Sequence, residues 1–263
     1  MKNLLEARAI TKRFGGLEAL TDVALTIARG EIYGLIGPNG AGKTTLFNVL
    51  TGFYHADAGD FLFDGAPLKV TAPHEVAAAG IARTFQNIRL FGNMTALENV
   101  MVGRHVRTVA GVFGAVLRTR HARDEERAIH TRARDLLEYV GVGARQHDLA
   151  SSLPYGDQRR LEIARALATD PKLLALDEPA AGMNATETAT LKQLLERIRA
   201  DGTTILLIEH DVKLVMGLCD RVAVLDYGRK IAEGAPASVQ RDAAVIAAYL
   251  GGALVYGDDY LRF

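Results

Sequence analysis

The sequence contains a single cysteine, Cys219, among its 263 residues. One cysteine excludes an internal disulfide framework and is typical of a protein of the reducing cytosol. Cys219 lies in an apolar stretch, so we interpret it as a small buried hydrophobic residue rather than a reactive thiol. The fold must therefore be stabilised by an apolar core, which a chain of this length is able to bury.

The sequence also has no excess of charge of either sign and no long hydrophobic run. Its 31 lysines and arginines balance 31 aspartates and glutamates, so the overall field does not steer the chain toward nucleic acid or an anionic membrane. No stretch approaches the ~18–20 apolar residues that cross a bilayer, and the N-terminus lacks the apolar core of a signal peptide. We therefore expect a chain that is soluble when isolated and that reaches a membrane only through a partner.

Short apolar runs and stretches of two-residue alternation predict strands along most of the chain. These strands lie within residues 4–10, 19–27, 31–37, 172–178, 203–210 and 220–234. Helices are expected from Lys43 to about Leu50 and over residues 187–202, where Gly202 ends an apolar face. That face consists of Leu191, Leu194, Leu195 and Ile198. Strands that alternate with helices imply an α/β protein with an open, mostly parallel sheet.

The middle of the chain, residues 92–150, contains no convincing strand. Residues 124–142 predict an amphipathic helix with one apolar stripe. The stripe consists of Ile129, Ala133, Leu136, Leu137 and Val140. We interpret this region as a helical insertion into the α/β core. Within it, residues 104–134 hold eight arginines against three acidic residues, which form either a solvated face or a surface that meets anionic lipid head groups or a partner.

The stretch "GPNGAGKT", Gly37 to Thr44, fits the phosphate-loop pattern G-x-x-x-x-G-K-[ST] between an apolar strand and a helix. Its glycines let the backbone turn successive N–H groups toward a β-phosphate. Lys43 is expected to reach the β- and γ-phosphate oxygens, and the Thr44 hydroxyl to ligate Mg²⁺. The residues that we assign to this cradle are Gly37, Pro38, Asn39, Gly40, Ala41, Gly42, Lys43, Thr44 and Thr45.

Two buried strands end in residues that suit phosphate chemistry. "LLALDEP" places Asp177 and Glu178 at the edge of the sheet where ligands of open parallel sheets bind. We expect Asp177 to hold Mg²⁺ or its water, and Glu178 to accept a proton from the attacking water. "LLIEHD" places His210 at the same edge, where we expect it to contact the γ-phosphate.

A second helix start with the properties of an anion site occurs far from the phosphate loop. In "SSLPYGDQRRLEIARAL", residues 151–167, Pro154 and Gly156 break the chain before an amphipathic helix. The first N–H groups of a helix lack partners and carry the positive end of its dipole. The sequence therefore holds one more phosphate site than a single nucleotide requires.

Taken in order along the chain, these motifs resemble those of the ATP-binding cassette (ABC) ATPases, from about Leu4 to Gly251. The resemblance implies a P-loop NTPase core with a mixed, mostly parallel sheet, an N-terminal antiparallel β part and a helical insertion. It implies a single domain over residues 1–251. Its core would be formed by residues 1–90 and 156–251, its helical subdomain by residues 91–155, and residues 252–263 would be a tail. It also implies that Phe14 stacks on the adenine of ATP, and that Gln86 senses Mg²⁺ and couples the site to a transmembrane permease.

The resemblance gives the second helix start a role. It implies that Tyr155, Gly156 and Asp157 belong to a signature motif that contacts the γ-phosphate held by a second ATPase subunit, packed head to tail. Pro154 replaces the usual serine of this motif, Tyr155 its first glycine and Asp157 its glutamine. The partner is then either a second copy of this chain or a different ATPase with the standard signature.

A narrower resemblance concerns the transported substrate. The tyrosine-containing signature, "DEPAAGMN" and the ending "VIAAYLG" are similar to the ATPase subunit of branched-chain amino acid importers. This implies a peripheral protein on the cytoplasmic side of the inner membrane that energises amino acid uptake, with the cargo delivered by an external binding protein. Importers of urea and amides belong to the same subgroup and remain an alternative.

Two other classes of function fit these motifs less well than transport does. A soluble ABC-type ATPase that acts on nucleic acid or ribosomes usually carries a long coiled-coil insertion or two cassettes, often with a basic surface. This chain has one cassette, a short insertion and no net charge, so no nucleic-acid partner is expected. A metabolic kinase or GTPase requires an acceptor site or a guanine-reading loop, and it explains neither the signature nor His210.

Overall fold

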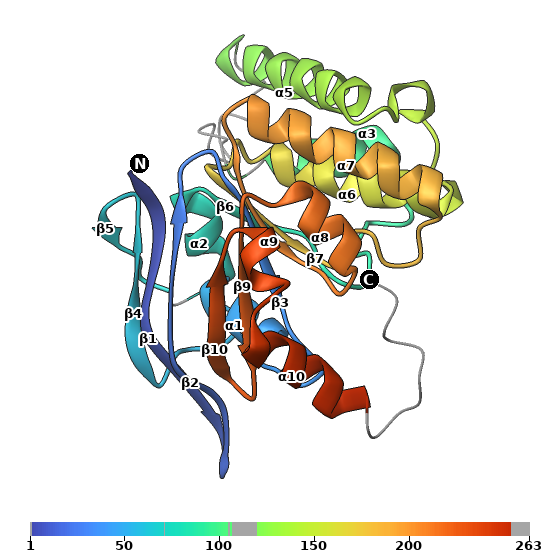
Figure 1. Cartoon of the computed structure of the whole chain (residues 1–263). Coiled ribbons are helices and arrows are strands. Elements are labelled where there is room, and N and C mark those ends of the chain that lie inside the picture. The colour runs from blue at the N-terminus through green and yellow to red at the C-terminus, as the bar shows by residue number, and fades with distance from the viewer. Residues whose placement is uncertain (1, 71, 105, 107–119, 254–263) are drawn as a thin grey trace.

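The computed structural model describes residues 2–70, 72–104, 106 and 120–253 (Figure 1). Its strands are β1 (Asn3–Phe14), β2 (Leu17–Ala28), β3 (Ile32–Ile36), β4 (Ala58–Phe63), β5 (Ala66–Pro67), β6 (Ile81–Arg83), β7 (Leu173–Asp177), β8 (Thr204–Ile208), β9 (Arg221–Asp226) and β10 (Arg229–Gly234). Its helices are α1 (Lys43–Leu50), α2 (Pro73–Ala79), α3 (Ala96–Arg104), α5 (Arg120–Tyr139), α6 (Tyr155–Leu167), α7 (Ala185–Ala200), α8 (Val212–Leu218), α9 (Pro236–Val239) and α10 (Ala243–Ala253), with 3₁₀ turns at Gly143–Arg145 and Ala150–Ser152.

The strands form two sheets. A four-stranded antiparallel sheet has the order β2-β1-β4-β5, and a six-stranded sheet has the order β10-β9-β3-β8-β7-β6. All pairs of the second sheet are parallel except β9 with β10. In the middle of that sheet, Leu35 of β3 pairs with Ile208 of β8 and with Ala223 of β9. The predicted α/β class, with a mostly parallel sheet and an N-terminal antiparallel part, is confirmed.

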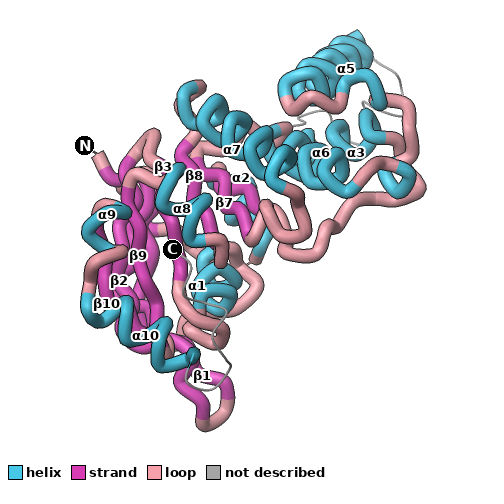
Figure 2. The backbone as a smooth tube through the Cα atoms, turned by 45° about the vertical axis from the view of Figure 1, so that its right-hand side comes forward, coloured by secondary structure: helices cyan, strands magenta, loops and turns pink. Residues whose placement is uncertain are grey.

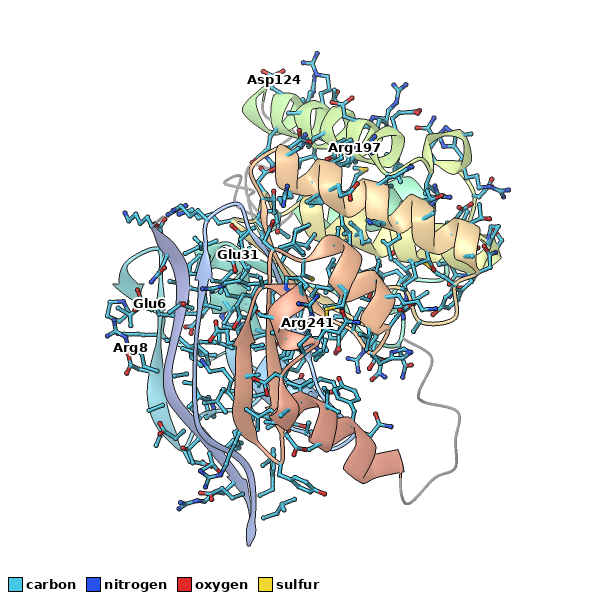
Figure 3. All side chains as sticks on the ribbon, viewed as in Figure 1. Glu6, Arg8, Glu31, Asp124, Arg197 and Arg241 are labelled. Atoms are coloured by element: carbon cyan, nitrogen blue, oxygen red, sulfur yellow. The ribbon has the colours of Figure 1, made fainter. Side chains whose placement is uncertain are left out.

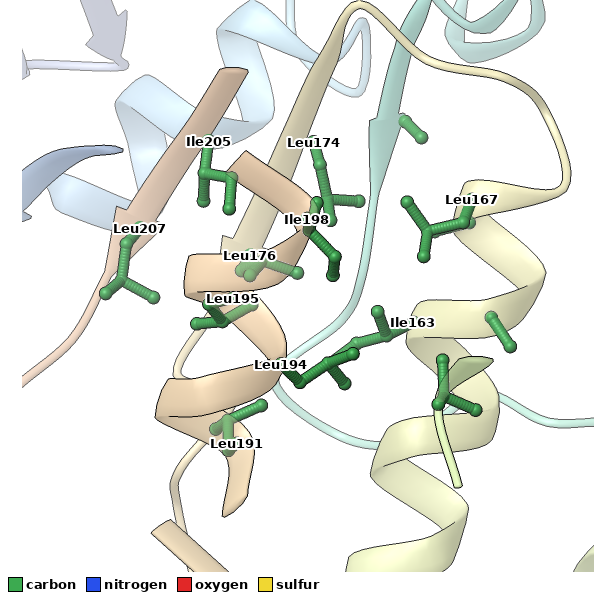
Figure 4. Close-up of a cluster of buried hydrophobic side chains, with 14 of the residues drawn as sticks. Ile163, Leu167, Leu174, Leu176, Leu191, Leu194, Leu195, Ile198, Ile205 and Leu207 are labelled. Carbon is green, nitrogen blue, oxygen red and sulfur yellow. The ribbon is translucent and has the colours of Figure 1, made fainter. Parts of the chain in front are cut away.

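Every residue of β3, β7 and β8 is buried, because helices and the four-stranded antiparallel sheet cover the two faces of the six-stranded sheet. Alternate residues of each strand point to opposite faces. Leu174 and Leu176 of β7 pack with α6 and α7, which Figure 4 shows, whereas Leu173 and Ala175 pack with α1 and the antiparallel sheet. The buried face of α7 is the one that the sequence predicts, formed by Leu191, Leu194, Leu195 and Ile198.

Helices α3, α5 and α6 pack against one another as a group beside the parallel sheet, which α6 contacts at β6 (Figure 2). Of the predicted stripe on α5, Ala133, Leu136 and Leu137 are buried and Ile129 is half-buried, while Val140 is buried just beyond the helix end. The guanidinium of Arg197 on α7, labelled in Figure 3, lies 4.1 Å from the ring centroid of Tyr139 and fastens α5 to α7.

Several elements escaped prediction: β4, β6, α2 and α3 are not evident from sequence periodicity. Cys219 is buried, as predicted, and burial raises the pKa of its thiol to about 12. No helix in the described part of the chain has the length and apolar character that crossing a bilayer requires. The boundaries of the helical subdomain, 91 and 155, stay a prediction. Residues 105 and 107–119 of the arginine-rich stretch 104–134, and residues 254–263 of the tail 252–263, lie outside the described residues.

Candidate functional site

The phosphate loop connects the end of β3 to the start of α1, and close backbone contacts require two of its glycines, Gly37 and Gly42. A Cβ atom on Gly37 would lie 2.1 Å from the carbonyl oxygen of Leu225, and one on Gly42 would lie 2.8 Å from that of Ala19. Gly42 also has a φ of 100°, which disfavours any residue with a Cβ. The loop is thus confined between β2 and the β9–β10 hairpin, whose Gly228 N–H donates to the Ala41 carbonyl at 3.0 Å.

Lys43 is buried at the start of α1, with 8% of its surface exposed. Its Nζ donates to the carbonyl oxygens of Gly37 at 2.7 Å and Pro38 at 3.0 Å. Burial lowers the pKa of Lys43, and the nearby carboxylates of Glu178 and Asp177 oppose that shift. An ammonium has three N–H donors. The two loop carbonyls therefore orient the Lys43 ammonium across the cradle, and its third donor stays available for a phosphate oxygen. Thr44, the next residue, is exposed at the loop.

The carboxylates of Asp177 and Glu178 lie at the end of β7, next to Lys43 as predicted. Asp177 is 3% exposed, and burial raises the pKa of its carboxyl to about 6, although the Arg83 guanidinium opposes this shift. Glu178 leaves the strand with a φ of 47°, in the left-handed region that non-glycine residues rarely adopt. Its N–H donates to the carbonyl of Ile208 at 2.8 Å, so the neighbouring strand holds this strained turn in place.

Gln86 and His210 join the same group. The Nε2 of Gln86 donates to Oε2 of Glu178 at 3.0 Å, and Nδ1 of His210 lies 3.7 Å from the same oxygen. The structure therefore brings together Lys43, Asp177, Glu178, Gln86 and His210 from four separate segments of the chain. All of them lie at the carboxyl ends of parallel strands or directly after them, as expected for an open α/β sheet.

Glu209 is a member of this group that the sequence reasoning missed. Its carboxylate is fully buried, accepts the Ala180 N–H at 2.8 Å and the His210 N–H at 3.2 Å, and its pKa is raised by burial. It therefore orients the loop that follows Glu178 and the backbone of His210. The available signal was an acidic residue at the end of a buried apolar strand, where a charge is rarely tolerated without partners.

Phe14 ends β1 and is 40% exposed, with its ring edge-on to Tyr54 at a centroid distance of 5.2 Å. The β1–β2 hairpin that carries Phe14 reaches the phosphate loop, as the contact between Ala19 and Gly42 shows. Tyr249 of α10 accepts a hydrogen bond from the Gly37 backbone N–H of the phosphate loop. Burial raises the pKa of Tyr249 to about 12, and this hydrogen bond opposes the shift. In the sequence, Tyr249 belongs to the ending "VIAAYLG", and nothing there indicates a contact with the phosphate loop.

The signature residues Tyr155, Gly156 and Asp157 form the first turn of α6 and do not lie with the phosphate loop. Helix α6 is grouped with α3 and α5, whereas α1 lies among the strands, in both Figure 1 and Figure 2. Within the described chain, Pro154 provides no side-chain cap to the helix. The carboxylate of Asp157 pairs with Arg160 and lies 3.3 Å from Nε of Arg145, so its charge is balanced within its own subdomain.

The donor set at the sheet edge fits a magnesium ion bound together with a nucleotide. Among the residues that the structure describes, no group of three or more histidine, cysteine, aspartate or glutamate side chains is placed to enclose a metal. Mg²⁺ commonly takes one or two carboxylates and completes its shell with phosphate oxygens and water. Asp177 and the Thr44 hydroxyl supply such a partial set of hard oxygen ligands beside the cradle.

Two features define a P-loop nucleoside triphosphatase. One is a confined glycine loop with its lysine after β3, and the other is an acidic pair at the end of β7, which one strand separates from β3 in the parallel sheet. A model of the family described as ABC transporter matches residues 20–181, and one described as branched-chain amino acid ATP-binding cassette transporter matches residues 229–255. The chain therefore belongs to the ABC transporter family, as an ATPase whose cassette binds ATP, and the resemblance read from its sequence is confirmed.

Individual relatives agree with this family over nearly the whole chain. The high-affinity branched-chain amino acid transport ATP-binding protein LivG of Escherichia coli (strain K12) is 46% identical over 94% of this chain and 98% of its own length. The corresponding protein BraF of Pseudomonas aeruginosa is 44% identical over the same shares. The crystal structure of MJ1267 in its ADP conformation, described as an ATP-binding cassette of an ABC transporter, matches with a TM-score of 0.83 and 32% identity over 95% of this chain and all of that one.

Proposed function

We propose that this chain is the ATP-hydrolysing subunit of an importer for branched-chain amino acids, on the cytoplasmic side of the membrane. One observation supports the ATPase function: Lys43, Asp177, Glu178, Gln86 and His210 lie together at one sheet edge. The signature residues lie apart from the phosphate loop, on α6. Branched-chain amino acids are proposed as the cargo because the relatives LivG and BraF are described as branched-chain amino acid transport proteins. Import of urea or amides is the alternative cargo.

In the proposed reaction, the phosphate loop holds the triphosphate and the acidic pair directs water to it. Lys43 and the loop N–H groups bind the β- and γ-phosphate oxygens. Magnesium, held by Asp177 and Thr44, would neutralise charge on those oxygens. Glu178 accepts the proton of the attacking water, and its hydrogen bond from Gln86 together with the strained turn fixes where its carboxylate points. His210 contacts the γ-phosphate, and Phe14 stacks on the adenine ring.

The active unit is proposed to be a pair of ATPase subunits. The start of α6 offers backbone N–H groups at the positive end of a helix, but it lies apart from its own phosphate loop. In a head-to-tail pair, Tyr155, Gly156 and Asp157 of one chain close on the γ-phosphate that the other chain holds. ATP then lies between the subunits, and its hydrolysis releases them. The pair is formed by two copies of this chain or by this chain with a related ATPase.

A groove beside the Gln86 segment is the proposed docking site for the transmembrane permease. It has a volume of about 660 Å³, and its apolar walls come from α2, β6, α3 and α6. Three arginines, Arg83, Arg89 and Arg165, line it, and the Phe91 side chain at its edge is 47% exposed. The permease segment that fits this chemistry is a short cytoplasmic helix with an apolar face and an acidic residue.

The proposal is tested by isolating the chain with its membrane partners and measuring transport. The complex is purified, placed in proteoliposomes with its external binding protein, and assayed for uptake of leucine, urea and ribose. We expect ATP-dependent uptake of leucine but not of urea or ribose, and none with Glu178→Gln as the matched inactive control. Uptake of urea alone would move the cargo to the alternative. A chain that co-purifies with ribosomes or nucleic acid, and with no membrane protein, would contradict the transport function.

A further inference from the structure

The side chain of Arg159 is 2% exposed and lies where the start of α6 meets the segment that carries Gln86. Its Nη1 donates to the carbonyl oxygen of Phe85 at 2.6 Å, and its Nη2 donates to that of Gln86. The same Nη2 lies 3.2 Å from the hydroxyl oxygen of Tyr155, the first residue of the helix. A guanidinium presents its donors in a rigid plane, so one side chain fixes these three groups relative to one another.

Glu162, one turn further along α6, accepts hydrogen bonds from the same segment of the chain. Its Oε2 lies 3.3 Å from Nη1 of Arg159, and its Oε1 accepts the backbone N–H groups of Phe85 and Arg89, each at 3.3 Å. Both members of this ion pair are buried. Together, Arg159 and Glu162 bind the backbone of Phe85, Gln86 and Arg89 to α6.

The guanidinium of Arg159 is not fully satisfied in its buried position. Among the described residues, its Nε is the buried side-chain nitrogen without a hydrogen-bond partner. A buried donor without a partner weakens the fold, while the other two nitrogens bind Glu162 and the carbonyls of Phe85 and Gln86. The use of Arg159 therefore lies in what its other two nitrogens hold in place.

From this connection a continuous path leads to the reacting group. The backbone carbonyl of Gln86 accepts from Arg159, and the side chain of the same Gln86 donates to Glu178 at 3.0 Å. The Tyr155 ring also lies against Gly182 in the loop after Glu178, where a Cβ atom would be 3.4 Å from Cε1 of the ring. Displacing the first turn of α6 therefore changes the surroundings of Glu178 from two sides.

We propose that Arg159, with Tyr155, is a positioning residue that couples closure at the start of α6 to the placement of Gln86 and Glu178 in the chain's own site. The inference rests on the proposed function, in which the start of α6 binds the nucleotide of the partner subunit. When that nucleotide draws in the first turn of α6, the guanidinium carries the movement to the Gln86 carbonyl. Each site thereby responds to the occupancy of the other.

A double-mutant cycle tests this coupling, because contact in a structure does not by itself demonstrate it. The kcat and KM for ATP are measured for the wild type, Tyr155→Phe, Gln86→Ala and the double variant. Tyr155→Phe removes one hydroxyl and keeps the ring. We expect it to lower kcat by about 3- to 10-fold with KM changed less than about 2-fold, and to change kcat by less than about 1.5-fold when Gln86 is already alanine.

The matched control is Tyr139→Phe, which removes the same hydroxyl from another tyrosine that pairs with an arginine. Tyr139 donates to Asp201 at 2.6 Å and stacks on Arg197, in contacts separate from Gln86. We expect the control to keep kcat within about 1.5-fold of the wild type in either background, since its loss is one of stability alone. Arg159→Lys, which keeps the charge and loses the planar fork, is expected to repeat the non-additive pattern of Tyr155→Phe.

Three results would overturn the coupling: an unchanged kcat in Tyr155→Phe, an equal loss with and without Gln86, or an equal loss in Tyr139→Phe. Should Arg159→Lys fail to fold, the cycle with Tyr155→Phe decides alone. The wild-type rate per chain is measured in parallel against protein concentration. A rate that rises with concentration, together with additive losses, rejects this inference and leaves the proposed function standing. A rate independent of concentration rejects both.

Discussion

The two segments of this chain that are proposed to bind phosphate are held in place by different means. The loop from Gly37 to Lys43 is confined by main-chain atoms, with Gly37 and Gly42 pressed against the carbonyls of Leu225 and Ala19. The start of α6 is held by charged side chains, through the pairs of Asp157 with Arg145 and Arg160 and through the fork of Arg159. Main-chain packing has one arrangement, whereas side-chain ion pairs can re-form after a small shift.

This difference matches the two tasks that the segments are proposed to perform. A loop that keeps hold of one nucleotide gains from a fixed shape, because preorganised N–H groups need no rearrangement when phosphate binds. A helix start that closes on a partner's nucleotide and later releases it must move as a body. Four variants test this comparison: the first leaves both segments intact, and the other three alter the phosphate loop or its immediate surroundings.

Glu178→Gln is expected to have the largest effect, because it removes the proton acceptor and leaves both phosphate-binding segments intact. Turnover should fall by at least about 100-fold, the usual size of a general-base contribution, while ATP still binds. With ATP and Mg²⁺ the variant should collect as a dimer in size-exclusion chromatography. Near-normal turnover would place the proton acceptor elsewhere, and persistent monomers would show that two copies of this chain alone do not close.

Lys43→Ala breaks only the confined loop. Charge-assisted hydrogen bonds to phosphate oxygens are lost, so the affinity for ATP should fall by roughly 10- to 100-fold. Equilibrium binding of a fluorescent ATP analogue measures the change, and Lys213→Ala, at the exposed start of α8, serves as the control that keeps the affinity. An affinity equal to that of the wild type would mean that Lys43 does not contact the triphosphate.

Asp177→Asn tests how burial of a carboxylate beside the phosphate loop affects the stability of the fold. Because burial raises the pKa of Asp177 from its ordinary 3.8 to about 6, the folded state binds its proton more tightly than the unfolded state. Its contribution to stability is therefore complete below about pH 4 and is lost as the pH rises through 6. The variant lacks this loss, so at pH 8 it should be more stable than the wild type by about 1–2 kcal/mol, after the loss from a buried amide.

Denaturant unfolding of the nucleotide-free protein between pH 4 and pH 8 measures this difference. The two proteins should converge in stability toward pH 4 and separate above pH 6. Parallel pH dependences in the two proteins would contradict the assignment of this titration to Asp177.

Tyr249→Phe is expected to have the smallest effect of the four. It removes the hydroxyl that accepts from the Gly37 backbone, while the contact of Gly37 with Leu225 still confines the loop. The loss of one neutral hydrogen bond should weaken ATP binding by about 3-fold or less and leave kcat unchanged. A loss as large as that of Lys43→Ala would show that α10, rather than main-chain packing, holds the phosphate loop.

The part of the site that could be predicted consists of motifs formed by consecutive residues. The phosphate loop, the acidic pair and His210 each sit at the end of an apolar strand, and parallel strands bring such ends together without further information. The α/β class and the buried face of α7 follow from periodicity in the same way. The spacing of Leu191, Leu194, Leu195 and Ile198 specifies a buried helix face wherever the helix packs.

The residues that escaped prediction depend on contacts between distant segments. Arg159 binds carbonyls of residues more than 70 positions earlier, and Glu209 binds the N–H of Ala180, 29 positions away. The sequence around Arg159 does not distinguish it from a charged residue on a solvated helix. The position of Glu209 at the end of an apolar strand indicates burial but does not identify its partner. Strand β6 escaped for a related reason, because its three residues are too few to show a period and its pairing with β7 defines it.

The central claim, that each active site is completed by a second molecule, is tested most directly by mixing two defective variants. Lys43→Ala lacks a working phosphate loop, and Gly156→Asp blocks the start of α6 with a side chain and a negative charge. Each alone should be nearly inactive, whereas half of the dimers in an equal mixture hold one complete site, which restores roughly a quarter of the wild-type ATPase rate. A mixture no more active than the mean of its two components would contradict the account.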